Sequence, residues 1–210
     1  MSAGPPSSRR FARSDEPSLK RIIVAITGAS GAIYGIRALE LLRAAGAETH
    51  LVVSPSGVRT IAEETDRDLD SVKSLATVVH GFKDIGASIA SGSFLVDGML
   101  VAPCSVKTLS AIAHCGTDEL VARAADVQLK ERRRVVLLFR ETPLHAGHIA
   151  IMERATMNGA IVMPPVPAFY HRPATIDDIV TQTVGRALDL FGIDAKSVHR
   201  WNGGGTDAPG

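Results

Sequence analysis

Two kinds of hydrophobic pattern alternate along the chain. In one, short runs of apolar and mostly β-branched residues follow one another without polar interruption, which predicts strands buried on both faces of a sheet. In the other, apolar residues recur every three or four positions, which predicts helices with one buried face. Five runs of the first kind predict five parallel strands, at residues 22–26, 49–53, 98–102, 134–139 and 160–163.

Helical spacing lies between and after these runs. It is carried by Ile33, Ile36, Leu39 and Leu42, then by Leu120, Ala124 and Val127, and finally by residues 176–190. Strands that alternate with helices in this way predict an α/β fold, a flavodoxin-like or Rossmann-like three-layer sandwich with a parallel sheet between two layers of helices. We expect one such domain at residues 21–195, between a disordered N-terminal arm (1–20) and a C-terminal tail (196–210) that offer little to bury.

Composition narrows the classes of function. Hydrophobic residues make up 45% of the 210 residues and charged residues 21%, as in an ordinary globular protein, and no apolar run is long enough to span a bilayer. The formal net charge of +1 gives no broad positive field for nucleic acid. The two cysteines, Cys104 and Cys115, are too far apart for a Cys-x-x-Cys pair, so we expect free thiols and a cytoplasmic location.

The residues that follow the predicted strands are the first candidates for a site. In open parallel sheets, ligands bind outside the carboxyl ends of the strands. Here those positions carry small residues, hydroxyl groups and one arginine, Arg140. They lie at residues 27–31, 54–57, 103–105, 140–143 and 164–167.

The turn after the first strand favours a mononucleotide. Gly28-Ala29-Ser30-Gly31 leads into a helix, where backbone N–H groups can approach a phosphate, although a tight turn without a ligand explains the glycines as well. A dinucleotide fold would carry an acid after the second strand to hold the ribose, and this chain has Ser54 there. No phosphate-binding loop of the ATPase kind is present.

Three other segments carry candidate chemistry. Residues 105–108 open a helix with two hydroxyls and a lysine, which fits either a polar ligand or simple capping by Ser105. Arg140 and Glu141 could clamp a phosphate and move a proton, or form a surface ion pair. Tyr170 lies in a proline-stiffened loop, whose aromatic side chains could form a wall for a small apolar group. His145 and His148 have no obvious third metal ligand, so we interpret them as a helix start and expect no metal.

Several collinear segments within residues 20–194 resemble those of one family, the UbiX-type flavin prenyltransferases, including the small B subunits associated with hydroxyarylic acid decarboxylases. The segments are Ile-Thr-Gly-Ala-Ser-Gly-Ala at 26–32, Ala-Ser-Gly-Ser at 90–93, Ala-Pro-Cys-Ser at 102–105, Arg-Ala-Ala-Asp-Val at 123–127 followed by Leu-Lys-Glu-Arg at 129–132, Arg-Glu-Thr-Pro-Leu at 140–144, and Pro-Ala-Phe-Tyr at 167–170.

The resemblance implies an activity and a partner. It implies that the chain joins a dimethylallyl group from dimethylallyl phosphate to N5 and C6 of reduced FMN, and that a UbiD-type decarboxylase receives the prenylated FMN. It also implies a metal-independent homo-oligomer, usually a dodecamer, in which the prenyl site is completed across subunit interfaces.

The same matching implies roles for individual residues. FMN would be held by Gly28, Ala29, Ser30, Ser54, Ser105, Val106, Lys107, Thr108 and Arg140. Tyr170 and Arg186 would hold dimethylallyl phosphate, and catalysis would fall to Glu141, Lys130, Arg123 and Ser30. In this reading the cations stabilise the departing phosphate, Tyr170 and Trp201 wall the allylic group, and Glu141 assists removal of the C6 proton.

Two departures and three rival functions stay open. His145-Ala146-Gly147-His148 is less familiar in the family and could alter the rim of the pocket. Glu119 stands where the family commonly has Asn, which adds a negative charge. An FMN-dependent cysteine decarboxylase should carry a Pro-x-Met-Asn signature, whereas Thr156-Met157-Asn158 lacks the proline. A non-catalytic flavin carrier would differ only in assays, and a nicotinamide-dependent flavin reductase lacks its ribose-binding acid. The sequence does not distinguish a monophosphate from a diphosphate donor.

Overall fold

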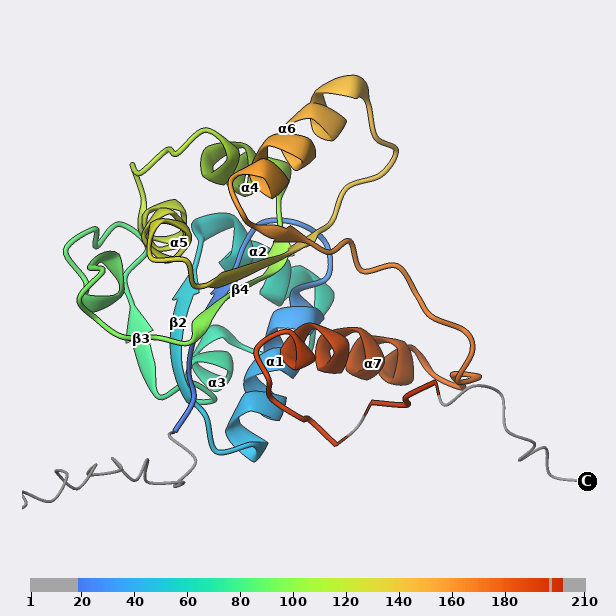
Figure 1. The fold of residues 1–210 in the computed structure, drawn as a ribbon. Coiled ribbons are helices and arrows are strands. Elements are labelled where there is room, and N and C mark those ends of the chain that lie inside the picture. Colours follow the sequence, from blue (N-terminus) through green and yellow to red (C-terminus); the bar gives the residue numbers. More distant parts are fainter. Residues whose placement is uncertain (1–18, 197, 202–210) are drawn as a thin grey trace, which may run out of the picture.

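A six-stranded parallel sheet forms the centre of the protein (Figure 1). The computed structural model describes residues 19–196 and 198–201. The strands are β1 (Arg21–Ile26), β2 (Glu48–Val53), β3 (Val78–His80), β4 (Gly98–Cys104), β5 (Arg134–Phe139) and β6 (Ile161–Val162). Their order across the sheet is β3-β2-β1-β4-β5-β6, and every neighbouring pair is parallel.

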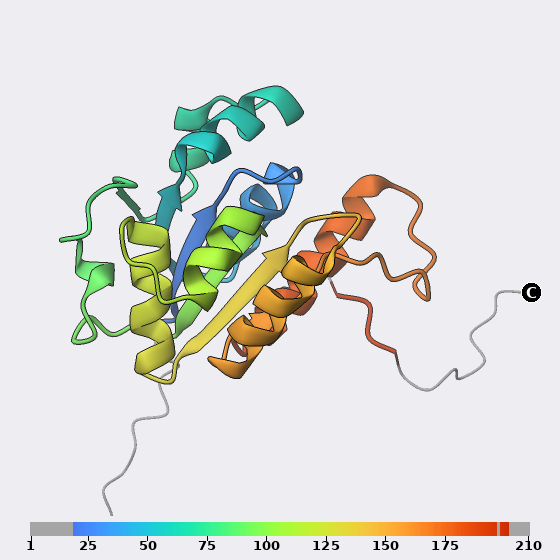
Figure 2. The same cartoon turned by 90° about the horizontal axis from the view of Figure 1, so that it is seen from above.

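Helices cover both faces of this sheet, as the view from above shows (Figure 2). One face carries α1 (Ala32–Ala44) and α7 (Ile176–Asp189), and the other carries α4 (Val106–Ala113), α5 (Leu120–Lys130) and α6 (Ala146–Met157). The connections around β3 contain α2 (Pro55–Glu64), α3 (Leu69–Lys73) and the 3₁₀ helix η1 (Ser88–Ala90). The predicted three-layer α/β class is confirmed.

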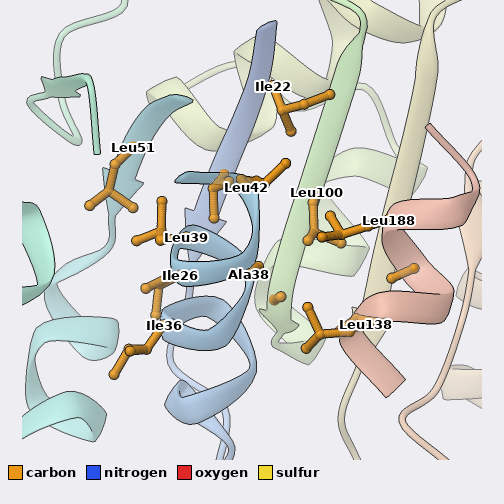
Figure 3. Close-up of a cluster of buried hydrophobic side chains, with 14 of the residues drawn as sticks. Ile22, Ile26, Ile36, Ala38, Leu39, Leu42, Leu51, Leu100, Leu138 and Leu188 are labelled. Atoms are coloured by element: carbon orange, nitrogen blue, oxygen red, sulfur yellow. The ribbon is translucent and has the colours of Figure 1, made fainter. Parts of the chain in front are cut away.

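Burial on both faces explains the uninterrupted apolar runs. In β1, Ile22, Val24 and Ile26 belong to the core cluster beneath α1 and α7, while Ile23 and Ala25 belong to the cluster beneath α4 and α5. Figure 3 shows the first cluster, in which Ile36, Leu39 and Leu42 of α1 lie over the sheet. Because side chains alternate between faces, a strand covered on both sides requires apolar residues at every position.

The predicted count of five strands is wrong, because the sheet has a sixth strand, β3. This strand is three residues long and pairs only with β2 in the sheet, at its edge. Its Val79 is 43% exposed, so no buried run marks it in the sequence. The other five strands agree with the predicted ones, although β6 is shortened to two residues.

Residues on both sides of the predicted domain limits contact the domain. Lys20, assigned to the arm, forms an ion pair with Asp97 at 2.9 Å, and its carbonyl accepts a hydrogen bond from the Glu48 N–H. Of the residues assigned to the tail, His199 and Arg200 contact Gln182 and Asp189 of α7, and the Trp201 ring packs against Tyr170. The rest of the predicted arm (1–18) and residues 197 and 202–210 of the tail lie outside the described residues. Within the described part of the chain, no helix is both long and apolar enough to cross a bilayer.

Helix α1 packs closely on the sheet at Gly35. A Cβ atom at this position would lie 2.3 Å from the Ala102 carbonyl oxygen and 2.6 Å from Cγ1 of Ile26. Backbone at such a distance must move to admit a methyl group. Gly35 is therefore required for the contact between α1 and β4.

We predict that Gly35→Ala lowers the free energy of unfolding by about 1–3 kcal/mol through overpacking. Alanine ordinarily stabilises a helix by about 1 kcal/mol relative to glycine. A decrease in the free energy of unfolding would therefore indicate overpacking. Urea denaturation measures it. The control is Gly81→Ala, where the nearest atom to a new Cβ would be 3.7 Å away, and which we expect to be neutral or slightly stabilising. Equal effects of the two substitutions would contradict the close contact.

A chain of polar side chains crosses the edge of the sheet from β1 through β2 to β3. Nδ1 of His50 lies 2.9 Å from Nε2 of His80, and Nε2 of His50 lies 2.8 Å from Oε1 of Glu48, which accepts a hydrogen bond from Arg21. His50 is 3% exposed. Burial, followed by the charge of His50, lowers the pKa of His80 below its usual value, and the Arg21 hydrogen bond lowers that of Glu48.

We predict that His80 makes the protein less stable as the pH falls. The folded state binds fewer protons than the unfolded state when the folded pKa is depressed, so stability is present above a pH of about 6.5 and lost below it, by up to about 1.4 kcal/mol per pH unit. His80→Gln should weaken the dependence of the free energy of unfolding on pH between pH 7 and 5. His114→Gln, at an exposed histidine, should leave the wild-type slope, and an unchanged slope in His80→Gln would contradict the assignment.

Candidate active site

A cavity of about 670 Å³ opens at the carboxyl ends of β1, β2, β4 and β5. This is the point where the strand order reverses, between β1 and β4, which is where open α/β sheets bind ligands. The cavity is lined by Gly28, Ala29, Ser30, Ser54, Pro55, Ser56, Phe82, Ser105, Val106, Lys107, Thr108, Ala111, Gly116, Asp118, Glu119, Ala122, Arg140 and Glu141. All nine residues predicted to hold FMN are among them, together with Glu141.

Thr27 joins the two strands that border the cavity. Its hydroxyl donates to the Pro103 carbonyl at 2.7 Å and accepts from the Ser105 N–H at 2.9 Å. Thr27 is 1% exposed. The turn after β1 is thereby fixed to the start of α4. The role of Thr27 cannot be predicted from the sequence, because its partners lie 76 and 78 residues further along the chain.

The turn after β1 requires its glycines. A Cβ at Gly28 would lie 2.1 Å from Cβ of Ser56, and Gly31 has a φ of 103°, which favours glycine. Oε2 of Glu64, at the end of α2, accepts hydrogen bonds from the N–H groups of Gly31 and Ala32, at 2.7 and 3.2 Å. The N-terminus of α1, which the glycine pattern assigned to an anion, is thus already paired with a carboxylate.

Two other helices present their N-termini to the cavity. Ser54 caps α2 by accepting from the Gly57 N–H at 3.0 Å, and Ser105 caps α4 by accepting from the Thr108 N–H at 3.3 Å. Within the described part of the chain, the N–H groups of Ser56, Val106 and Lys107 have no partner. Of the two interpretations of Ser105, a ligand contact or a helix cap, the structure shows the cap. The cap leaves the other N–H groups of the first turn available to an anion.

Arg140 supplies a positive charge to the same cavity. Its backbone N–H donates to the Cys104 carbonyl at 3.1 Å, which fixes the residue beyond β5. No carboxylate of the described residues pairs with its guanidinium, and Oε1 of Glu141 instead accepts from the Thr142 N–H at 3.0 Å. The alternative of an ion pair between Arg140 and Glu141 is thus not observed. Burial raises the pKa of Tyr34, and the nearby charge of Arg140 opposes this shift.

Glu119 belongs to the opposite wall of the cavity. It caps α5, and its carboxylate accepts from the N–H groups of Val121 and Ala122 at 2.7 and 2.9 Å. Burial raises its pKa, and the two hydrogen bonds oppose the shift. The unfamiliar acid at this position is therefore a helix cap. Phe82 also lines this wall, and it was missed because the strand that precedes it, β3, was not predicted.

Four predicted site residues lie outside this cavity. Arg123 pairs with Asp126 at 3.3 Å, and Lys130 pairs with Glu131. Tyr170 and Arg186 line a separate cavity of about 350 Å³ with His199, Arg200 and Trp201. Within one chain, the residues predicted to bind FMN are thus brought together, whereas those predicted to bind the dimethylallyl donor form a different group.

The two histidines at 145 and 148 begin a helix, as predicted. His145 is the N-cap of α6, its Nδ1 accepts from the Gly147 N–H at 3.0 Å, and the His148 ring completes the capping box. Among the residues that the structure describes, no three His, Cys, Asp or Glu side chains are arranged to hold a metal ion.

The large cavity fits a flavin mononucleotide. Its volume falls within the range of roughly 300–1,000 Å³ that is usual for small-molecule sites. The unpartnered N–H groups of α2 and α4, together with Arg140, suit a phosphate. Phe82, Ala111 and Ala122 provide apolar wall for a ring system.

Comparisons with known proteins agree with this chemistry. Residues 10–188 match the family model described as Flavoprotein. The chain is 58% identical over 183 residues to the flavin prenyltransferase UbiX of Thauera aromatica, covering 87% of this chain and 94% of the relative. It is 55% identical over 188 residues to the flavin prenyltransferase UbiX of Escherichia coli K12, covering 88% of this chain and 100% of the relative.

A solved structure shows the same fold at high identity. The crystal structure of AnUbiX (PadA1) in complex with FMN and dimethylallyl pyrophosphate superimposes with a TM-score of 0.87 at 51% identity, covering 88% of this chain and 98% of that chain. A dodecameric FMN-dependent UbiX-like decarboxylase from Escherichia coli O157:H7 has a TM-score of 0.85 at 46% identity, covering 87% and 100%. The chain therefore belongs to the Flavoprotein family and, within it, to the UbiX flavin prenyltransferases.

Proposed function

We propose that this protein is a flavin prenyltransferase that joins the dimethylallyl group of dimethylallyl phosphate to N5 and C6 of reduced FMN. The observation that carries the proposal is the single cavity that collects all nine predicted FMN residues, in a chain 58% identical to a flavin prenyltransferase over almost its whole length. The product is prenylated FMN.

In this proposal the large cavity holds FMN. The first-turn N–H groups of α2 and α4 and the Arg140 guanidinium bind the phosphate, and the small residues Gly28, Ala29 and Ser30 admit the flavin close to the backbone. When bound in its reduced form, FMN supplies the nucleophilic nitrogen and carbon to which the five-carbon group becomes attached.

The remaining chemistry falls to residues of the protein. The allylic C–O bond breaks and its electron pair leaves with the phosphate, so cations must take up the growing negative charge; Arg140, Lys130, Arg123 and Arg186 are the candidates. N5 bonds to the carbon that loses the phosphate. C6 bonds to the far alkene carbon as the alkene π bond opens and the carbon between takes up a proton. N5 and C6 each lose one proton, so one proton is released overall and can leave with the phosphate. Glu141, which lines the cavity with a carboxylate that no described cation pairs, is the candidate acceptor for one of the two protons that N5 and C6 lose.

We further propose that the donor site is completed between copies of this chain. Tyr170, Arg186, Arg123 and Lys130 do not line the flavin cavity of their own chain. Large apolar side chains, which contact surfaces usually bury, are exposed on α6 and the segment after it: Ile149 by 56%, Met157 by 82%, Val166 by 74% and Phe169 by 69%. The dodecameric state of a UbiX-like relative supports the same assembly here.

The proposal extends to partner, location and domain limits. Prenylated FMN would pass to a UbiD-type decarboxylase, and the two free cysteines, Cys104 and Cys115, support a reducing cytoplasmic environment. The catalytic domain would span residues 21–195, with an arm before it and a tail after it.

The rival functions have less support. Cypemycin decarboxylase CypD superimposes with a TM-score of 0.61 but is only 14% identical, so it shares the fold alone. A non-catalytic flavin carrier would have no need of the unpaired Glu141 beside the flavin cavity. A nicotinamide-dependent reductase would need an acid after β2, where Ser54 instead caps α2.

We predict that anaerobic incubation of the protein with reduced FMN and dimethylallyl phosphate yields a flavin heavier by one C5 prenyl unit, measured by mass spectrometry of the released flavin. Glu141→Gln should keep the wild-type Kd for FMN and slow prenylation by about 100-fold or more, as expected when a general base is lost. Glu63→Gln, at an exposed acid on α2, serves as the control. Unmodified FMN with both mono- and diphosphate donors would sink the proposed activity.

A second prediction concerns the phosphate. Arg140→Met should raise the Kd for FMN about 10- to 100-fold, because a charge-assisted hydrogen bond contributes about 1.5–3 kcal/mol. Binding of riboflavin, which lacks the phosphate, should change far less. Flavin fluorescence titration gives both constants, and Arg43→Met, at an exposed arginine, is the control. An equal loss for both flavins would place Arg140 at another part of the ligand.

A further inference from the structure

The smaller cavity is lined in part by residues near the C-terminus. Its five lining residues are Tyr170, Arg186, His199, Arg200 and Trp201, and the last three belong to residues 199–201, which we call the C-terminal segment. Two guanidinium groups, a phenol and an indole thus border about 350 Å³. This composition suits a phosphate attached to a small apolar group.

One buried amide holds the C-terminal segment in place. Gln182 of α7 is 3% exposed. Its Nε2 donates to the Tyr170 hydroxyl at 2.9 Å and to the His199 carbonyl at 3.0 Å, and its Oε1 accepts from the His199 N–H at 2.9 Å. The Tyr170 hydroxyl also donates to the His199 carbonyl at 3.0 Å. Because the amide is satisfied on both sides, the position of His199, and hence of Arg200 beside it, is specified by the fold.

A carboxylate on the same helix links the two arginines of the cavity. Asp189 has a side chain that is 14% exposed. Arg200 donates to both of its oxygens, at 2.9 and 3.0 Å, while Arg186 donates to Oδ2 alone. The hydrogen bond from Arg200 is the main cause of the lowered pKa of Asp189, so the carboxylate stays ionised.

We propose that Arg200 is a positioning residue for Arg186: by holding Asp189 through both oxygens, it leaves Arg186 able to turn to the phosphate of the dimethylallyl donor. This rests on the proposed function, which gives Arg186 that ligand. Without Arg200, Asp189 would have Arg186 as its remaining partner, and a donor phosphate would compete with a nearby carboxylate for one guanidinium. With Arg200 in place, Asp189 keeps two hydrogen bonds when Arg186 leaves it.

The charges around the cavity agree with this arrangement. Arg186 and Arg200 against Asp189 leave one positive charge, whereas Arg186 against Asp189 alone would leave none. Asp194 also reaches Arg200, at 3.3 Å, but both side chains of this pair are more than half exposed, at 64% and 53%, so water screens it more than the pair with the 14%-exposed Asp189. Arg200 therefore makes the cavity attractive to an anion without itself having to touch it.

The test is the steady-state prenylation of reduced FMN by dimethylallyl phosphate, with KM for the donor and kcat measured separately. Arg200→Ala should raise this KM about tenfold, which corresponds to about 1.4 kcal/mol, and leave kcat within about twofold. The Kd for FMN should be unchanged, because Arg200 does not line the flavin cavity. Arg200→Lys, which keeps the charge but cannot hold both oxygens in one plane, should fall between wild type and Arg200→Ala.

A double-mutant cycle separates positioning from direct contact. If Arg200 acts through Asp189, then adding Arg200→Ala to Asp189→Asn should change the KM less than about twofold, because no carboxylate remains to hold Arg186. The matched control is Arg67→Ala, which removes an arginine that pairs with Glu40 and lines neither cavity. It should leave KM and kcat at wild-type values.

The possible results distinguish a failure of this inference from a failure of the proposed function. An unchanged KM in Arg200→Ala, with wild-type prenylation intact, would overturn the inference and leave the proposed function standing. If Arg200→Ala still raises the KM for the donor tenfold in the Asp189→Asn background, the inference is also overturned, because Arg200 would then bind the donor itself. Failure of the wild-type protein to prenylate FMN would instead count against the proposed function, and Arg186→Ala, which should lose donor affinity while keeping FMN, tests the ligand given to Arg186.

Discussion

The hydroxyl of Thr27 holds together the two strand ends on which the site depends. Strands β1 and β4 are neighbours in the sheet, and the chain turns away from them in opposite directions across it. A crevice at such a point is shaped by loops that have no regular structure of their own, so something must fix one loop to the other. Thr27 does so with a donated and an accepted hydrogen bond, and it is shielded from water, which would otherwise compete for both.

The fold thus brings the residues predicted to bind FMN together within one chain and places Tyr170 and Arg186, predicted to bind the donor, at a separate cavity. Glycines, helix caps and Arg140 converge on the large cavity, while Tyr170 and Arg186 lie by α7 and the C-terminal segment. A reaction that releases an allylic phosphate needs dense positive charge and little water. The proposed assembly of several copies would supply both, because it would place cations of one chain beside the flavin of another and cover the exposed apolar side chains of α6.

Much of this could be predicted from the sequence, and the physical reason differs from element to element. Strands β1 and β5 were found to within a residue, because burial on both faces leaves an unbroken apolar run. The residues that follow β1, β2, β4 and β5 line one cavity, as expected for parallel strands that end at one edge. Thr27, Glu64 and Gln182 were not found, since a polar side chain reveals its distant partner only after folding. The edge strand β3 is too exposed to leave a pattern.

The helix N-termini around the sheet edge also restrict where an anion can bind. Glu64 occupies the N-terminus of α1 and Glu119 that of α5, so both positive ends are already neutralised by carboxylates of the protein. A phosphate at either place would have to displace a bound carboxylate or lie against its charge, and like charges a few ångströms apart repel. The N-termini of α2 and α4 carry only neutral serine caps and line the same cavity as Arg140. The N-termini of α2 and α4 are therefore the ones that could bind a phosphate, because carboxylates of the protein already occupy the N-termini of α1 and α5.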